Sequence, residues 1–211
     1  MDPSIFLPAI VIVILSIIFH EVAHGYAADL LGDPTARYAG RLTLNPIPHI
    51  DPVGSVLLPG ILALTSSPFL IGWAKPVPYN QYNLRNQRWG EALVAFAGPL
   101  TNIALALIAG LLLRFFAVSM SPLMAGVLVM AGYSNLFLAI LNLVPIPPLD
   151  GSKILVALLP TSLAIEYRRL ERMTYALGSA GLIIVLLLFV FVLSAPLSAL
   201  VQFLFFSIVG L

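Results

Sequence analysis

The chain carries the pattern His20-Glu21-Val22-Ala23-His24 inside an apolar run that is long enough to cross a membrane. Positions i and i+4 lie on one face of an α-helix, so the two imidazoles can bind a single metal ion. The glutamate between them then lies next to the metal, where a carboxylate can accept a proton from water. Ionisable groups are costly inside a membrane and usually serve a function there. The pattern therefore predicts a metal site on a membrane-spanning helix.

The composition indicates a membrane protein. Hydrophobic residues make up 60% of the 211 residues and charged residues only 9%, whereas soluble domains carry about 25% charged residues. The net charge of +1 gives no indication of nucleic-acid binding, and the absence of cysteine excludes disulfides and cysteine-ligated zinc. Five uncharged stretches are each near or above the roughly 18 residues of a spanning helix: 3–19, 52–74, 92–113, 115–149 and 173–211.

We expect an all-α polytopic membrane protein with about five to six transmembrane helices. Glycine and proline at 32–34 end the first helix, and three prolines at 145–148 end the helix that precedes them. Segments 38–44 and 72–78 are predicted to be short extended strands near the cytoplasmic face, and residues 166–172 an interfacial helix. The predicted spanning helices are 4–31, 90–117, 122–143, 173–193 and a short last helix at 196–211.

The third metal ligand is less evident than the first two. A catalytic zinc ion usually has three protein ligands and one open position. Only three histidines are present, so the third ligand is His49, a carboxylate or absent. Asp150 differs from the other carboxylates because the prolines before it unwind the preceding helix and leave it in a loop. We therefore favour Asp150.

Asp150 can meet His24 only if both lie at the same membrane face. This requires segment 55–71, which is broken by prolines and serines, to be re-entrant rather than to cross the membrane. Nine of the ten basic residues then share that face, which the positive-inside rule makes cytoplasmic, and only Arg114 lies opposite. The nine are Arg37, Arg41, Lys75, Arg85, Arg88, Lys153, Arg168, Arg169 and Arg172.

Four motifs in this order resemble the site-2 protease family of intramembrane zinc metalloproteases. They are His20-Glu21-x-x-His24, Gly72-Trp73-x-x-Pro76-Val77-Pro78, Gly98-Pro99-x-x-Asn102 and Asn142-x-x-Pro145-x-x-x-Leu149-Asp150-Gly151. The resemblance covers about residues 5–155. It implies that His20, His24 and Asp150 bind Zn²⁺ and that Glu21 is the catalytic base. We expect one domain, 1–211, with a catalytic core at about 5–155, C-terminal helices at about 156–211, and no PDZ-like insertion or appended regulatory domain.

Two buried amides and one further histidine complete the candidate site. Hydrolysis needs a donor for the developing oxyanion, and Asn142 and Asn102 are the candidates for that role, with Asn142 favoured as the catalytic residue. Asn102 and His49 are candidate substrate-binding residues. The alternatives are hydrogen bonds between helices for the two asparagines and an ordinary interfacial position for His49. Gly98-Pro99 is interpreted as a packing kink.

The predicted activity is hydrolysis of peptide bonds in transmembrane or membrane-associated substrates near the cytoplasmic face. We expect a multi-pass protein of a prokaryotic cell membrane whose partners are the lipid bilayer and a transmembrane substrate, with no nucleic acid. One alternative is a catalytically inactive membrane-binding pseudoprotease, which the intact Glu21 disfavours. Another is a different membrane protease with the same histidine motif, which would need additional ligands on other helices. A metal transporter should carry polar residues along several helices, and segment 115–141 is apolar.

Overall fold

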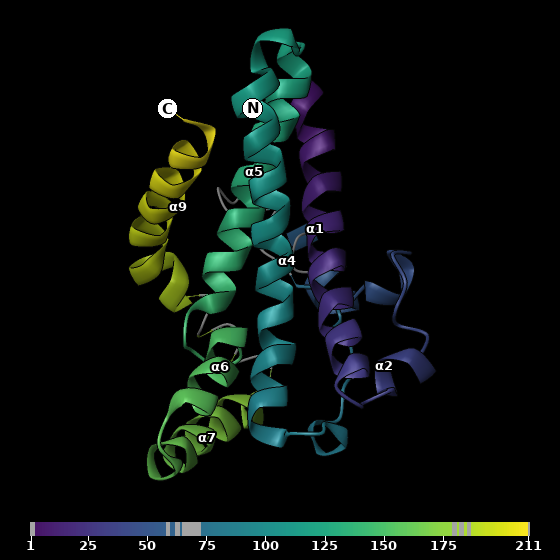
Figure 1. Ribbon diagram of the computed structural model, residues 1–211, viewed down its shortest axis with the longest axis vertical. Helices are drawn as coiled ribbons and strands as arrows, with labels where there is room; N and C mark the ends of the chain where they lie inside the picture. Colours follow the sequence, from purple (N-terminus) through teal and green to yellow (C-terminus); the bar gives the residue numbers. More distant parts are fainter. Residues whose placement is uncertain are drawn as a thin grey trace.

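Helices account for most of this computed structural model, which describes residues 3–57, 60, 61, 64, 73–178, 181, 184 and 187–210. The upright elements in Figure 1 are α1 (Pro3–Leu30), α4 (Gln87–Phe116), α5 (Pro122–Leu143) and α9 (Ser194–Val209). Shorter turns of helix, η1 to η5, cover Ile47–His49, Pro52–Leu57, Gln81–Asn83, Ala117–Ser119 and Phe189–Leu193. Three further helices lie at the lower end: α2 (Thr35–Tyr38), α6 (Asp150–Leu158) and α7 (Thr161–Ala176).

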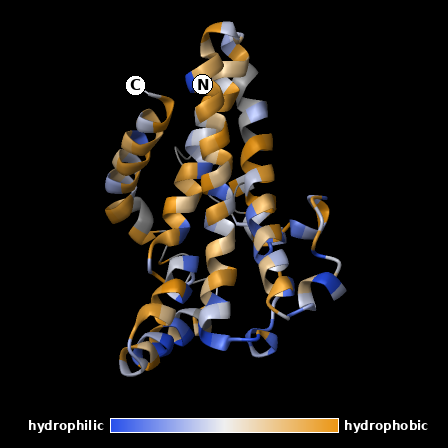
Figure 2. Ribbon diagram, in the orientation of Figure 1, coloured by the Kyte–Doolittle hydropathy of each residue, from blue (hydrophilic) through white to orange (hydrophobic). Residues whose placement is uncertain are grey.

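The end of α1 and the start of α4 lie at the lower end of Figure 1, and α5 leads down towards it through α6 and α7. The Arg85 amide donates to the Leu31 carbonyl at 3.0 Å, and the Arg88 Nε donates to the Ala157 carbonyl at 2.8 Å. We call this region, with α2, α6 and α7, the polar end, because Figure 2 shows most hydrophilic ribbon there. Helix α4 runs away from the polar end and α5 returns to it, as the topology argument requires.

The helix boundaries follow from local chemistry. Gly32, with a φ of 109°, reverses the chain after α1. The Asn86 side chain accepts hydrogen bonds from the Arg88 and Trp89 amides at 3.1 and 3.0 Å and so caps α4. The Ser121 hydroxyl accepts from the Met124 amide at 3.3 Å and caps α5. These caps fix where α4 and α5 begin.

Four helices of the described chain are long and apolar enough to cross a membrane: Val11–Leu30, Gln87–Ser119, Pro122–Leu143 and Phe191–Val209. They correspond to the predicted helices 4–31, 90–117, 122–143 and 196–211. The predicted helix 173–193 is not confirmed, because residues 173–176 form the end of α7 and much of the remainder lies outside the described residues. The described residues therefore contain four candidate spanning helices, and the expected number of five to six is not confirmed.

The predicted re-entrant segment and the two predicted strands are not confirmed either. The predicted re-entrant segment 55–71 falls largely outside the described residues, apart from the end of η2 and residues 60, 61 and 64. The predicted strands at 38–44 and 72–78 are not confirmed, since the described residues contain no strand. A physical reason is clear for the second segment, because Pro76 and Pro78 have no amide hydrogen to donate to a sheet.

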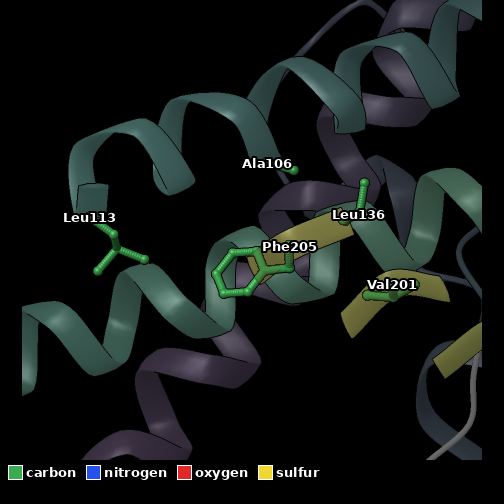
Figure 3. Close-up of a cluster of buried hydrophobic side chains, with 5 residues drawn as sticks. All are labelled: Ala106, Leu113, Leu136, Val201 and Phe205. Atoms are coloured by element: carbon green, nitrogen blue, oxygen red, sulfur yellow. The ribbon is translucent and has the colours of Figure 1, made fainter. Parts of the chain in front are cut away.

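An apolar cluster joins α9 to α4 and α5. Figure 3 shows its five buried side chains, and glycines allow the helices around them to approach closely. A Cβ at Gly110 would lie 2.5 Å from the side chain of Ile208, and one at Gly132 would lie 2.5 Å from the ring of Phe205. Small residues of this kind favour packing in lipid, where the hydrophobic effect between helices is weak. The apolar cluster consists of Ala106, Leu113, Leu136, Val201 and Phe205.

Candidate metal centre

Three predicted ligands converge at the polar end of the bundle. His20 and His24 lie one turn apart on α1, and Asp150 is the first residue of α6. The two Nε2 atoms are 3.0 Å apart, and each lies 3.2 Å from the Asp150 Oδ2. All three side chains are buried. The structure therefore brings together the three residues of the predicted ligand set.

The outer nitrogens of the two imidazoles fix which atoms face the centre. The His20 Nδ1 lies 2.5 Å from the Asn102 Oδ1, and the His24 Nδ1 lies 2.7 Å from the Val94 carbonyl oxygen. Both oxygens can only accept, so both Nδ1 atoms carry a hydrogen, and in a neutral imidazole this leaves Nε2 without one. Each Nε2 then directs a lone pair towards the other and towards the Asp150 carboxylate.

The residues present fit a zinc ion. Three electron-pair donors facing one another repel unless a cation lies among them. Ligands at tetrahedral zinc lie roughly 3.3 Å apart for bonds of about 2.0 Å, close to the 3.0 and 3.2 Å found here. The Asp150 Oδ2 is buried and has no hydrogen-bond donor among the described residues. His20, His24 and Asp150 could therefore hold a metal ion.

Gly98 of α4 keeps this position open. A Cβ at Gly98 would lie 2.5 Å from the His24 Nε2 and 2.6 Å from the His20 Nε2. Such an atom would fill the space next to the metal-facing nitrogens of both imidazoles. The interpretation of Gly98-Pro99 as only a packing kink therefore needs correction, since Gly98 packs directly against both imidazoles. Its spacing of four residues from Asn102, which contacts His20, is the sequence signal that could have shown this.

Glu21 and Asn142 lie at the same cavity as the candidate ligands. This cavity has a volume of about 420 Å³ and is also lined by residues 73, 74, 76 and 77. The Glu21 Oε2 accepts a hydrogen bond from the Val77 amide at 2.8 Å. The Asn142 Nδ2 donates to the Leu138 carbonyl of its own helix at 3.0 Å, which uses one of its two hydrogens.

Asn102 and His49 do not line that cavity. Asn102 is fully buried and contacts the rear of His20, so its position suits support of a ligand rather than contact with substrate. His49 is also buried, and its Nε2 lies 2.9 Å from the Thr43 carbonyl oxygen. His49 is not part of the cluster of candidate metal ligands in the described chain.

A second cavity of about 760 Å³ is lined by several charged side chains at the polar end. It shares Tyr79 and Lys153 with the metal cavity. Its Glu91 accepts from the Arg168 Nη2 at 2.8 Å. Burial raises the pKa of Glu171 in the same cavity, and the neighbouring Glu91 carboxylate raises this pKa further. The metal cavity is thus bordered by charged groups towards the polar end.

Comparison with known proteins identifies the family. A Bacillus subtilis protein named "putative zinc metalloprotease YwhC" is 38% identical over 196 residues, which cover 89% of this chain and 83% of that protein. The sequence model of peptidase family M50 matches residues 117–188. The chain belongs to peptidase family M50. This confirms the resemblance to site-2 proteases predicted from the motifs.

Two more distant relatives of this M50 peptidase extend the comparison. A Mycolicibacterium smegmatis protein named "putative zinc metalloprotease Rip2" is 32% identical over 139 residues, 65% of this chain. The chain spans about half of that relative, 52% of its length. A Methanocaldococcus jannaschii protein named "putative zinc metalloprotease MJ0611" is 31% identical over 154 residues, 72% of this chain and 70% of the relative. No solved structure matches the chain significantly.

Proposed function

We propose that the protein is an intramembrane zinc metalloprotease that cleaves transmembrane or membrane-associated substrates near the cytoplasmic face. The observation that carries this proposal is the convergence of His20, His24 and Asp150 beside Glu21 in one cavity. His24 precedes the end of α1 by six residues, or roughly 9 Å at 1.5 Å per residue. A metal at that depth lies within reach of water from the polar end. Family membership and the names of the relatives support the zinc chemistry.

The basic side chains support the orientation. Nine of the ten lysines and arginines belong to the polar end or to its connections. The exception is Arg114, whose Nη1 donates to the Ile208 carbonyl at 3.4 Å near the far end of α9. The positive-inside rule then makes the polar end cytoplasmic. We retain one domain, 1–211, as part of the proposal, because residues 174 and 178 from the C-terminal part also line the metal cavity.

Glu21 and Asn142 have distinct roles in the proposed hydrolysis. Bound zinc would supply a Lewis acid that polarises a carbonyl and lowers the pKa of water towards ~7. The Val77 amide holds the Glu21 Oε2, so the other carboxylate oxygen would accept a proton from water and later deliver it to the leaving amine. Asn142 would direct its second amide hydrogen to the carbonyl oxygen as negative charge develops there.

The segment at 73–79 offers a docking edge for the substrate. The backbone amides of its alternate residues face the rest of the protein. Those of Trp73, Lys75 and Val77 donate to the Gly54 carbonyl, the His49 carbonyl and the Glu21 carboxylate, respectively. Ala74 and Pro76 line the cavity, and their backbone groups have no hydrogen bond among the described residues. An extended peptide could pair with this edge, so a transmembrane substrate would have to unwind locally. The opposite side of this segment is occupied, because the Arg41 Nη2 donates to the Lys75 carbonyl at 2.8 Å.

Cleavage of a model transmembrane substrate in liposomes tests the proposal. The wild-type protein should cleave it, and Glu21→Gln should bind zinc equally well but lose activity by about 10²–10⁴-fold, the usual contribution of an acid–base group. A substrate with helix-breaking residues near the cytoplasmic face should be cleaved faster than a matched uninterrupted helix. Full activity of Glu21→Gln would contradict the assigned base. A wild-type protein that binds zinc but cleaves no substrate would favour the inactive membrane-binding alternative.

A further inference from the structure

A series of buried polar side chains runs through the helices behind His20. It connects three helices: Ser16 and His20 on α1, Asn102 on α4 and Asn135 on α5. The Asn102 Nδ2 donates to the Asn135 Oδ1 at 2.8 Å, and the Asn135 Nδ2 donates to the Ser16 Oγ at 2.8 Å. Exposed fractions of 2%, 0% and 2% for Ser16, Asn102 and Asn135 put these groups out of reach of solvent. Their hydrogen bonds must therefore be made inside the protein.

One backbone carbonyl determines which end of each amide in the series faces its neighbour. The Asn135 Nδ2 lies 2.9 Å from the Ala131 carbonyl oxygen, which can only accept, so the Asn135 amide has one allowed orientation. Its Oδ1 then faces Asn102 and requires the donor side of that amide. The Asn102 Oδ1 is left facing His20, 2.5 Å from the Nδ1. This nitrogen must carry the hydrogen, which leaves the Nε2 lone pair for a metal.

His24 has the same tautomer, but a backbone carbonyl contacts its Nδ1 directly. Its Nδ1 donates directly to the Val94 carbonyl oxygen at 2.7 Å, and a carbonyl cannot change from acceptor to donor. The Asn102 amide can change from acceptor to donor towards His20, because a half-turn of the side chain exchanges its oxygen and nitrogen. Among the described residues, the Asn102 Nδ2 has one other acceptor, the Ser16 carbonyl at 3.5 Å, and this distance is too long to hold the amide firmly.

We infer that Asn135 is a positioning residue that sets the tautomer of His20 through Asn102, and thereby the zinc affinity of the metal centre. Ser16 has a smaller part, because Ala131 alone fixes the Asn135 amide. Partners of this kind, one step removed from a metal ligand, typically change affinity by about 10–100-fold when removed. The inference rests on the proposed role of His20 as a zinc ligand.

The test measures the His20 tautomer and zinc affinity separately. ¹⁵N chemical shifts of labelled imidazoles report the tautomer in the zinc-free protein at mildly alkaline pH, and the chain has only three histidines to assign. In the wild type His20 should carry its hydrogen on Nδ1. In Asn135→Leu the Nε2 tautomer should appear, and zinc affinity in chelator competition should fall by about 10–100-fold. Asn135→Ala serves the same purpose if leucine prevents folding.

Two further variants separate positioning from a general loss of structure. Thr101→Val removes a hydroxyl that bonds only within α4, and should change neither measurement. Asn102→Asp, added to Asn135→Leu, places an obligate acceptor against His20 and should restore the Nδ1 tautomer and zinc affinity. Unchanged tautomer and affinity in Asn135→Leu, or failure of Asn102→Asp to restore the tautomer, would overturn the inference. If His20→Ala binds zinc normally while Asn135→Leu still shifts the tautomer, the proposed zinc ligand is wrong and the positioning is right.

Discussion

The metal centre and the apolar cluster both pack against α4 and α5, yet they are held together differently. At the metal centre the outer nitrogen of each imidazole has a specific partner, such as the Val94 carbonyl for His24. At the apolar cluster, Gly110 and Gly132 let α9 approach, and no directed bond is needed. Changes at the first region should therefore alter zinc binding and activity, while changes at the second should alter stability alone.

The same substitution at two glycines of α4 gives the largest contrast. Gly98→Ala places a methyl group among the three candidate ligands and should reduce zinc affinity at least as much as loss of a supporting residue, by about 100-fold. Gly110→Ala places it against Ile208 and should lower the thermal unfolding midpoint while zinc still binds. Zinc titration and thermal unfolding in detergent measure both effects. Normal zinc binding by Gly98→Ala would remove the distinction between the two regions.

A deletion in the apolar cluster should affect stability only. Phe205→Ala removes a buried ring that packs against Gly132, and should lower the free energy of unfolding by about 3 kcal/mol. Zinc affinity should stay within about two-fold of the wild type, because distant sites contribute independently. Phe203→Ala is the matched control, since that ring is 69% exposed on the same helix. A large loss of zinc in Phe205→Ala would show that the two regions are coupled.

The smallest expected effect concerns Asp33, which connects the polar end to the segment before α4. Its carboxylate accepts from the Asn80 amide at 2.6 Å and from the Asn83 Nδ2 at 2.8 Å. Burial alone would raise the pKa of Asp33, but hydrogen bonds from Thr35, Asn80 and Asn83 lower this pKa overall. The ionised form therefore stabilises the fold above the unfolded pKa of about 3.9, and that stability is lost as the pH falls through the folded pKa.

Asp33→Asn should accordingly lower the free energy of unfolding by about 1–2 kcal/mol at neutral pH. The difference from wild type should shrink as the pH falls below the unfolded pKa of about 4. Thermal unfolding of the wild type and of Asp33→Asn across this pH range measures the difference in stability. A difference that stays constant with pH would mean that the charge of Asp33 contributes nothing.

Much of the site could be predicted because its signals are local in sequence. The spacing of His20 and His24 fixes their common face, and the prolines before Asp150 end α5 where a carboxylate can turn back towards α1. The supporting series could not be predicted in the same way. Whether Asn135 meets Asn102 depends on how α4 and α5 are rotated about their axes, and that rotation follows from packing over their full length.

The fold predictions that are not confirmed have equally specific causes. The predicted helix 173–193 begins after the last charged residue, Arg172, whereas α7 continues to Ala176, because helical hydrogen bonding does not stop where charge stops. The strand prediction at 72–78 relied on an extended, proline-restricted pattern. That segment instead bonds to Gly54, His49 and Glu21, contacts that are distant in sequence.

The zinc content of purified Asp150→Ala protein, compared with wild type, tests the central claim most directly. Wild type should retain zinc through purification, and Asp150→Ala should lose it together with cleavage of the model substrate, because two histidines alone leave the centre incomplete. Glu166→Ala, which removes an exposed carboxylate from α7, should behave as wild type. If Asp150→Ala retains zinc and cleaves normally, the third ligand lies elsewhere and the metal centre described here is wrong.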